Sequence, residues 1–319
     1  MFFFVISGFL ISYVLEKKYP ANTESTYKFY KSRAIRIYSL YWVMYLFSAL
    51  VINPECVHKI WSSGPLNYLP SLFLFGVDWR VSFGDYPHEY YGLFPIGLNQ
   101  AWTLGSEMAF YLIAPFVLRS LTATLVLLIM SAMVRAALVH VFGFFESWTY
   151  HFFPSIILFF LLGHLSRVVH NKIRLPNKVG IGFLGLAIFF MMLSVNRIFD
   201  SPYFYLGIVS FALSLPYVFE LTKNNRILNF LGDTSYAIYL IHVMIIVYIW
   251  PLISPHIPFI AISNHPKFVF ACIQTAIIVC IAIGIGILVE IIVEKHVASV
   301  FRKIWGLAEQ KIARACIIN

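Results

Sequence analysis

The chain has 319 residues, of which 60% are hydrophobic and only 12% are charged. Soluble domains are about 45–50% apolar and about 25% charged, so this composition excludes an ordinary soluble domain. It also excludes a disordered chain, because disordered chains lack apolar side chains. The four cysteines have neither metal-ligand spacing nor the pattern of a disulfide framework. The sequence therefore predicts an all-α polytopic membrane protein without a metal site.

Nine apolar stretches follow one another along the chain, and most approach the roughly 20 residues needed to cross about 30 Å of hydrocarbon. They cover residues 1–15, 37–53, 101–118, 120–142, 150–166, 179–195, 203–221, 234–252 and 268–293. Their solidly apolar character excludes barrel strands. A shorter run at 65–77 is predicted to be a re-entrant or interfacial part of a long loop. We expect a transmembrane domain over residues 1–293 and a short, basic cytoplasmic tail over residues 294–319.

The distribution of Lys and Arg predicts the orientation of the bundle. If residue 1 lies outside and the loops alternate, eighteen of the 23 basic residues fall on inside segments and only four on outside loops. Arg135 lies within a span. Basic residues gather on the cytoplasmic side of membrane proteins. The net charge of +9 is then explained by topology. Membrane lipid is the expected partner, and nucleic acid is not.

The first predicted span is unusually short. Residues 1–15 reach only about 22 Å as a helix. No positive charge precedes them and no small-residue cleavage site follows, so they do not form a signal peptide. Nine spans also place the two chain ends on opposite sides of the membrane. We therefore expect that an upstream segment is missing and that the first span is itself shortened.

Four segments resemble, in the right order, the signature blocks of the acyltransferase 3 family. Residues 3–11 read FFVISGFLI, and residues 29–38 read FYKSRAIRIY, which contains the basic pair of the family. Residues 102–115 read WTLGSEMAFYLIAP, and residues 231–242 read LGDTSYAIYLIH. One block alone would be weak evidence, because apolar helices resemble each other by composition. Four blocks in order make the resemblance specific.

The resemblance implies about ten transmembrane helices in a bacterial cytoplasmic membrane, with both chain ends in the cytoplasm. It also implies transfer of an acyl group from cytoplasmic acyl-CoA to a hydroxyl, with acyl-CoA as a co-substrate and no permanently bound cofactor. The first helix of the family carries an arginine and a histidine regarded as essential. That helix precedes the block matched by residues 3–11. As written, the chain is expected to be impaired, whether as a fragment, a misannotated start or an inactive remnant.

A cationic cluster follows the first span. Arg33 and Arg36 are three residues apart, so they share one face of a helix, with Lys28 and Lys31 close by in the sequence. Arginine forks suit phosphate oxygens. The resemblance favours contacts of Lys31, Arg33 and Arg36 with the phosphates of CoA. The alternative is that these residues only hold the loop inside.

Glu107 lies within a predicted span, where a carboxylate has by default a functional or paired role. Arg135 lies at a similar depth in the next span, roughly 10–12 Å below the outer surface. We expect the two to form an ion pair or to face a common wet cavity. In the structural alternative, the ion pair only fixes the helix register. In the functional alternative, Glu107 orients the missing histidine or polarises an acceptor hydroxyl. Trp102 and Tyr111, from the same block, are expected to support this site with Arg135.

His242 lies near the middle of a predicted span. It is either a packing residue or a base that contacts the thioester, because imidazole titrates near neutrality. Ser235 and Tyr236 lie at the inner end of that span, where their hydroxyls would contact the pantetheine of acyl-CoA or cap and anchor the helix. Asp233 before Thr234 indicates a helix start, so the capping role is preferred.

The long outer loop over residues 54–100 is rich in aromatic residues and carboxylates, which suit a carbohydrate acceptor but equally suit an interfacial loop. These residues are Trp79, Asp85, Tyr86, Glu89, Tyr90 and Tyr91.

Taken together, the sequence predicts an O-acyltransferase that moves an acyl group from acyl-CoA to a hydroxyl of a cell-envelope carbohydrate or exported glycoconjugate. Glu107 and His242 are its predicted catalytic residues. The alternative is a transporter or flippase whose intramembrane polar residues line a path. That class favours internal repeats, and the two halves of the chain show no convincing similarity. A third possibility is a non-catalytic membrane partner left by truncation.

Overall fold

The computed structural model describes residues 1–52, 68–83, 98–143, 147–194, 201–256 and 267–318. These residues are mostly helical and contain no strand. Seven helices among them are long and apolar enough to cross a membrane. Two further predicted spans form the shorter helices α1 (Phe2–Lys18) and α7 (Trp102–Val117). The prediction of an all-α polytopic bundle is confirmed.

The chain divides into two compact units. Unit 1 comprises Met1–Tyr30, Leu74–Tyr86 and Trp102–Asn229, and unit 2 comprises Lys31–Phe73, Pro87–Ala101 and Phe230–Asn319. Each unit gathers segments that are far apart in the sequence. Neither unit therefore corresponds to a simple half of the chain.

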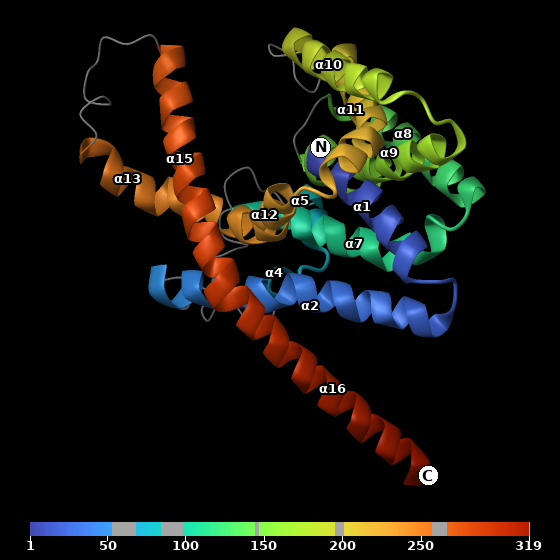
Figure 1. The fold of residues 1–319 in the computed structure, drawn as a ribbon, viewed down its shortest axis with the longest axis vertical. Helices are drawn as coiled ribbons and strands as arrows, with labels where there is room; N and C mark the ends of the chain where they lie inside the picture. Colours follow the sequence, from blue (N-terminus) through green and yellow to red (C-terminus); the bar gives the residue numbers. More distant parts are fainter. Residues whose placement is uncertain (53–67, 84–97, 144–146, 195–200, 257–266, 319) are drawn as a thin grey trace. The chain divides into compact units, whose positions relative to one another are not determined.

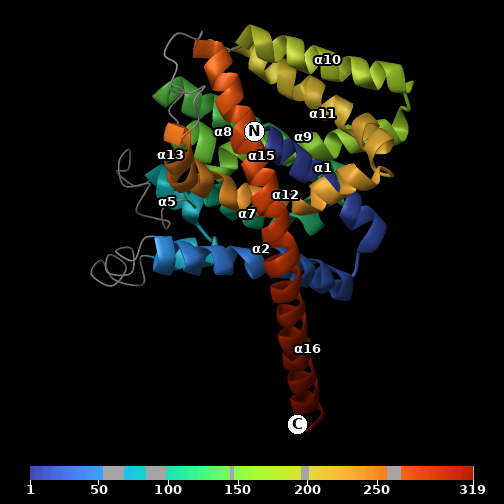
Figure 2. The same ribbon diagram turned by 60° about the vertical axis from the view of Figure 1, so that its left-hand side comes forward.

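Unit 1 is organised around a central helix, α9 (Phe153–Lys172), which is the most buried of its long apolar helices. The other helices of unit 1 are α1, α5 (Val77–Phe83), α7, α8 (Leu121–Phe142), α10 (Asn177–Ser194) and α11 (Pro202–Thr222). The most extensive helix pairs are α1 with α9 and α10 with α11, and both pairs run side by side in Figures 1 and 2. Phe159 and Phe160 of α9 are fully buried. The core of the unit therefore lies along α9.

Two glycines bring α1 and α9 into backbone contact. A Cβ added to Gly8 would overlap the carbonyl oxygen of Phe160, and one added to Gly163 would overlap the carbonyl oxygen of Val5. Small residues at a crossing let membrane helices approach closely. This approach sets the polar side chains of α1 directly against those of α9.

Unit 2 contains the remaining helices. They are most of α2 (Thr23–Phe47), α4 (Leu69–Phe73), α12 (nearly all of Arg226–Met244), α13 (Trp250–Ile253), α15 (Lys267–Val289) and α16 (Lys295–Ile318). A π-helical stretch, Glu290–Glu294, joins α15 to α16 without a break, and Figure 1 shows the chain changing direction between the two helices. The hydroxyls of Tyr38 and Tyr41 donate to backbone carbonyls of Phe73 and Ser71, which fixes α4 against α2.

Two predicted boundaries differ from the structure. Helix α2 begins at Thr23, well before the apolar run at residue 37, because its polar N-terminal part is also helical. The predicted helix start at Asp233 and Thr234 is wrong. Helix α12 begins at Arg226, where the Asn225 side chain accepts hydrogen bonds from the next backbone N–H groups. Asparagine is a favoured N-cap, so the helix begins after Asn225 and continues through Asp233 and Thr234.

Candidate active site

Polar side chains of α1 point toward two neighbouring helices of unit 1. Ser7 faces α7, whereas Ser12 and Glu16 are four residues apart, share a helix face and meet α9. Each of these three side chains contacts a polar group of its neighbour. Helix α1 therefore carries a line of polar contacts through the apolar core of the unit.

Glu107 is the buried carboxylate of this line. Its Oε1 accepts hydrogen bonds from Ser7 Oγ at 2.6 Å and from Tyr111 Oη at 2.5 Å. Tyr111 lies one turn further along α7, and its ring packs against Phe29. Hydrogen bonds to an ionised acceptor are about twice as strong as neutral ones. Two such donors hold the carboxylate in a fixed place inside the unit.

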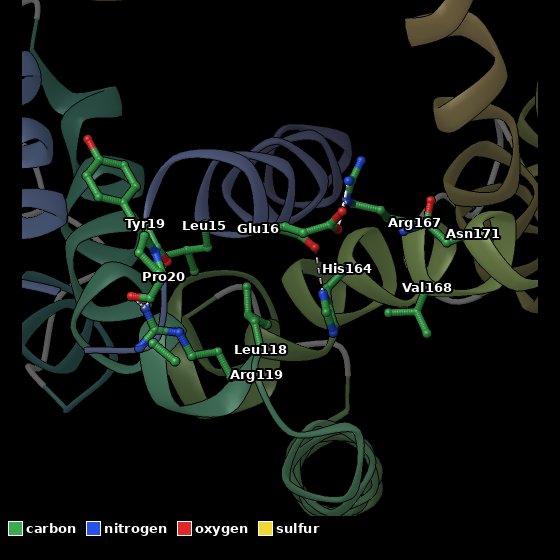
Figure 3. Close-up of a pocket in the computed structure, with 12 residues that line it drawn as sticks. Leu15, Glu16, Tyr19, Pro20, Leu118, Arg119, His164, Arg167, Val168 and Asn171 are labelled. Carbon is green, nitrogen blue, oxygen red and sulfur yellow. Dashed lines mark hydrogen bonds and ion pairs between the residues drawn. The ribbon is translucent and has the colours of Figure 1, made fainter. Parts of the chain in front are cut away.

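Ser12 and His164 form a second polar contact, further along α1. Ser12 Oγ lies 2.8 Å from His164 Nδ1. Both residues are buried, with exposed fractions of 6% for Ser12 and 5% for His164. Both line a cavity of about 440 Å³ that Figure 3 shows between α1 and α9. A hydroxyl and an imidazole thus share a hydrogen bond at the wall of a cavity.

Charged groups also line this cavity. Arg167 donates to Glu16 Oε2 from Nη2 at 2.7 Å and from Nε at 3.1 Å. Arg119 donates to the backbone carbonyls of Tyr19 and Pro20 at 3.1 and 2.9 Å, and Figure 3 shows its side chain reaching toward these residues. Arg119 therefore ties the segment after α7 to the end of α1.

A second cavity of about 390 Å³ adjoins the first, because Glu16, Arg167 and Asn171 line both. Its rim carries further basic side chains, namely Lys17, Arg174 and Lys223. The carboxylates of this lining are Glu16 and Glu220, and Glu220 Oε1 lies 3.3 Å from His170 Nε2. The lining of the second cavity thus contains four Lys and Arg side chains and two carboxylates. The double cavity is cationic.

The predicted ion pair of Glu107 with Arg135 is wrong. Arg135 donates to the Thr149 carbonyl at 2.5 Å and to Tyr205 Oη at 3.0 Å, and its guanidinium lies over the ring of Phe159. No ion pair among the described residues joins Arg135 to Glu107. Arg135 is instead a tie between α8 and the helices around it.

Trp102 begins α7 and is buried. Its ring centroid lies 4.3 Å from that of His151 and 5.2 Å from that of Tyr150. These contacts anchor the end of the helix that carries Glu107. Support of the site by Trp102 stays a prediction.

The basic residues predicted to bind CoA lie in unit 2. Lys31 Nζ forms an ion pair with Glu309 Oε2 at 2.7 Å. Arg36 is exposed and interacts electrostatically with Glu294, whereas Arg33 is half-buried. Lys31 is therefore engaged within its own unit. Phosphate binding by the three residues stays a prediction.

His242, Ser235 and Tyr236 also belong to unit 2, on α12. His242 Nδ1 lies 2.7 Å from the Tyr239 carbonyl, one turn back on the same helix. The Ser235 hydroxyl donates to a carbonyl of its own helix, and Tyr236 Oη donates to the Ile37 carbonyl at 2.7 Å. These contacts fit anchoring roles. Contacts of the three residues with acyl-CoA stay predictions.

The predicted acceptor loop is described only in part. The ring of Trp79 stacks on that of Phe83, with centroids 5.4 Å apart. The other residues predicted for acceptor binding fall within 84–97, which lies outside the described residues.

Residues 1–285 match the model of the acyltransferase 3 family, which is described as an acyltransferase domain. The chain belongs to this family. Comparison with curated proteins gives no match, and comparison with solved structures gives none either. With its seven apolar helices, the chain is a multi-pass membrane acyltransferase, and its family supports carbohydrates in general as the substrates.

In this membrane acyltransferase, unit 1 offers two groups suited to moving protons. The Glu107 carboxylate is held by hydroxyl donors, and the His164 imidazole lies against the Ser12 hydroxyl. A hydroxyl within hydrogen-bond reach of a base is the arrangement that nucleophilic catalysis requires. Within the described parts of the chain, no group of His, Cys, Asp or Glu could hold a metal ion.

Sequence reasoning missed the residues around the first cavity of the acyltransferase. The available signal was helical spacing: Ser12 and Glu16 are four apart, and His164 and Arg167 are three apart. Polar side chains on one face of a membrane helix favour a functional or paired role. This spacing could have predicted one polar face on α1 and one on α9, but it does not predict that the two faces contact each other.

Proposed function

We propose that the protein transfers an acyl group from acyl-CoA to a hydroxyl of a cell-envelope carbohydrate or exported glycoconjugate in a bacterial cytoplasmic membrane. The observation that carries this proposal is the buried Glu107 carboxylate, held by Ser7 and Tyr111 in a chain of an acyltransferase family. An ionised carboxylate only accepts hydrogen bonds. It is therefore suited to orienting an acceptor hydroxyl, or an imidazole that takes the proton of that hydroxyl.

Acyl-CoA is the proposed donor, used as a co-substrate and released as CoA after each transfer. Arg33 and Arg36 are the proposed contacts for its phosphates, because arginine forks match phosphate oxygens and the charge bias predicts an inside position. Ser235 and Tyr236 are proposed to lie along the pantetheine. His242 is the proposed second proton-transfer group, through Nε2.

The reaction would form one ester and break one thioester. The acceptor hydroxyl attacks the thioester carbonyl and loses its proton to the base, and CoA leaves with that proton as the thiol. A positioned acid or base contributes typically 10²–10⁴ in rate. Loss of the carboxylate should therefore reduce the chemical step rather than donor binding.

The test uses the chain in nanodiscs, with radiolabelled acetyl-CoA and an oligosaccharide acceptor. We expect Glu107→Gln to lower acetyl transfer by about 10²–10⁴ while CoA still binds. Glu24→Gln is the matched control, because Glu24 is exposed and pairs only with Lys28 one turn away among the described contacts. Unchanged transfer by folded Glu107→Gln protein would overturn the role of this carboxylate.

The rival function, a transporter or flippase, draws on the polar lining of the two cavities in unit 1. It differs from the enzyme in one measurable way. Transfer releases one CoA thiol for each acylated product, whereas transport moves substrate across the bilayer without thiol release. Thiol titration alongside a vesicle flux assay separates the two.

A further inference from the structure

The hydroxyl–imidazole pair of unit 1 has no part in the function proposed above. We infer that Ser12 is a nucleophile and His164 its base, so that the acyl group is held as an ester on Ser12 before it reaches the acceptor. This inference rests on the proposed acyl-CoA donor. It replaces the direct attack of the acceptor on the thioester by two steps, with two further catalytic residues and a covalent intermediate.

The hydrogen-bond geometry separates His164 from His242, the histidine predicted from the sequence. His242 Nδ1 faces the carbonyl of Tyr239, so that nitrogen carries the proton of the ring, and the described contacts give its Nε2 no hydroxyl partner. His164 Nδ1 faces the Ser12 hydroxyl at 2.8 Å. With the proton of the ring on Nε2, His164 Nδ1 accepts the hydrogen bond and is placed to take the hydroxyl proton.

The cavity gives this pair room for a substrate. Ser12 and His164 line a space of about 440 Å³, which adjoins the second cavity of about 390 Å³ through shared lining residues. Ligand pockets in proteins are about 300–1,000 Å³. The pair is buried and at the same time lines a cavity large enough to admit a thioester arm.

The charges around the cavities fit entry of acyl-CoA from the inside. Lys17, Arg174 and Lys223 on the rim all fall on the side that the charge bias predicts to be cytoplasmic. Ser12 lies one turn, about 6 Å, deeper along α1 than Glu16. In this inference the CoA phosphates bind at the rim instead of at Arg33 and Arg36, which leaves the thioester end of the donor directed toward Ser12.

A purely structural explanation accounts for only part of this arrangement. Helices α1, α9 and α11 all end near the rim, and basic residues there offset the partial negative charge of helix C-termini. That effect explains the lysines and arginines. It does not explain a serine and a histidine paired at the wall of a cavity one turn deeper.

The proposed steps balance in atoms and electrons. His164 Nδ1 takes the Ser12 proton, Ser12 Oγ attacks the thioester carbonyl, and the C–S bond breaks. The sulfur leaves with the electron pair and takes the proton from His164, which gives CoA thiol and acyl-Ser12. The acceptor hydroxyl then gives its proton to His164 and attacks the ester, and Ser12 Oγ leaves and recovers that proton.

The experiment traps the intermediate. The full chain in nanodiscs is mixed with radiolabelled acetyl-CoA without acceptor, quenched in acid, and examined by gel and peptide mass spectrometry. We expect up to one acetyl group per chain on the peptide that contains Ser12, stable to neutral hydroxylamine as an oxygen ester. Ser12→Ala should lose the label at least 100-fold, and His164→Gln should slow labelling by about 10²–10⁴.

Two further variants keep the result decisive. Ser12→Cys should still take the label, but as a thioester that neutral hydroxylamine removes, a change that a structural role of Ser12 would not produce. Ser214→Ala is the matched control, because Ser214 is a buried serine of unit 1 whose hydroxyl bonds within its own helix. Its labelling should equal that of the parent chain.

The outcomes distinguish this inference from the proposed function. Transfer to acceptor without label on the parent chain, or label that persists in Ser12→Ala, overturns the covalent step and leaves the acyltransferase function intact. Absence of both transfer and label from the parent chain overturns the proposed acyl-CoA reaction together with the intermediate.

Discussion

At the scale of single residues, unit 1 buries an acidic and a basic side chain, Glu107 and Arg135, whose described contacts are made with different groups. Glu107 is satisfied by hydroxyl donors, and Arg135 by a backbone carbonyl, a phenol and an aromatic ring. Burying a charge is costly unless it is paired or hydrogen-bonded. Each residue therefore has its own local set of partners. Glu107 Oε1 is thereby directed at hydroxyl groups, the type of group that the proposed reaction acylates.

Asp78 gives a prediction at the same scale. It is 2% exposed, and its Oδ2 accepts from the Phe153 N–H at 3.3 Å, at the start of α9. Burial raises the pKa of Asp78 from its ordinary value of 3.8 to about 6, although backbone hydrogen bonds oppose the rise. The folded protein then binds this proton more tightly than the unfolded chain does. Stability should fall as pH rises from about 4 to about 6, by roughly 3 kcal/mol in total.

The measurement is thermal unfolding in detergent at pH values between 4 and 7. Asp78→Asn should remove this part of the pH dependence, because an amide does not titrate. Asp233→Asn, at an exposed position of α12, serves as the control. Equal pH dependence of the Asp78→Asn variant and the parent chain would contradict the prediction.

Some site residues could be predicted from the sequence and others could not, for a physical reason. Glu107 stands out because a carboxylate in a membrane span is rare, and Tyr111 follows one turn later. The Arg135 pairing failed because depth along a span says nothing about the direction in which a side chain points. The partnership of Ser12 with His164 depends on the rotation of α1 against α9, which is set by packing across about 150 residues of sequence.

At the scale of the element, the contact of α1 with α9 positions the candidate site. Its tightest points are Gly8 and Gly163, where backbone atoms of the opposite helix occupy the place of a side chain. The helices themselves were predictable from apolar length, since predicted spans 1–15 and 150–166 overlap most of α1 and α9, although both helices end later than predicted. The point at which α1 and α9 cross was not predictable, because it depends on which small residues of the two helices come into contact.

We expect Gly8→Ala and Gly163→Ala to destabilise unit 1. The added methyl group would overlap a backbone carbonyl, and overpacking of this kind costs typically 1–3 kcal/mol. Thermal unfolding in detergent measures the effect. Gly182→Ala is the control, because nothing lies within 4 Å of a Cβ at that helical position. Similar stability of all three variants would show that the helices can separate without cost.

At the scale of the whole molecule, one long helix constrains how the chain meets the membrane. α15, the π-helical stretch and α16 together form 52 residues of continuous helix. Such a helix is about 78 Å long, whereas the hydrocarbon layer is about 30 Å thick. A large part of it must therefore lie outside the hydrocarbon. Within unit 2, α16 packs on α2 through Lys31 with Glu309 and through Trp42 with Phe301.

This packing predicts the side on which α16 leaves the bilayer. The part of α2 that α16 contacts includes Lys31, in the cationic segment that the charge bias places inside. In a cysteine-free background, Lys303→Cys should react with an impermeant maleimide only in inverted or permeabilised vesicles. Lys267→Cys should react in right-side-out vesicles, and Leu288→Cys in neither. Reaction of Lys303→Cys from the outside would also place Arg33 and Arg36 outside, away from cytoplasmic acyl-CoA, and would remove the basis for donor binding by those arginines.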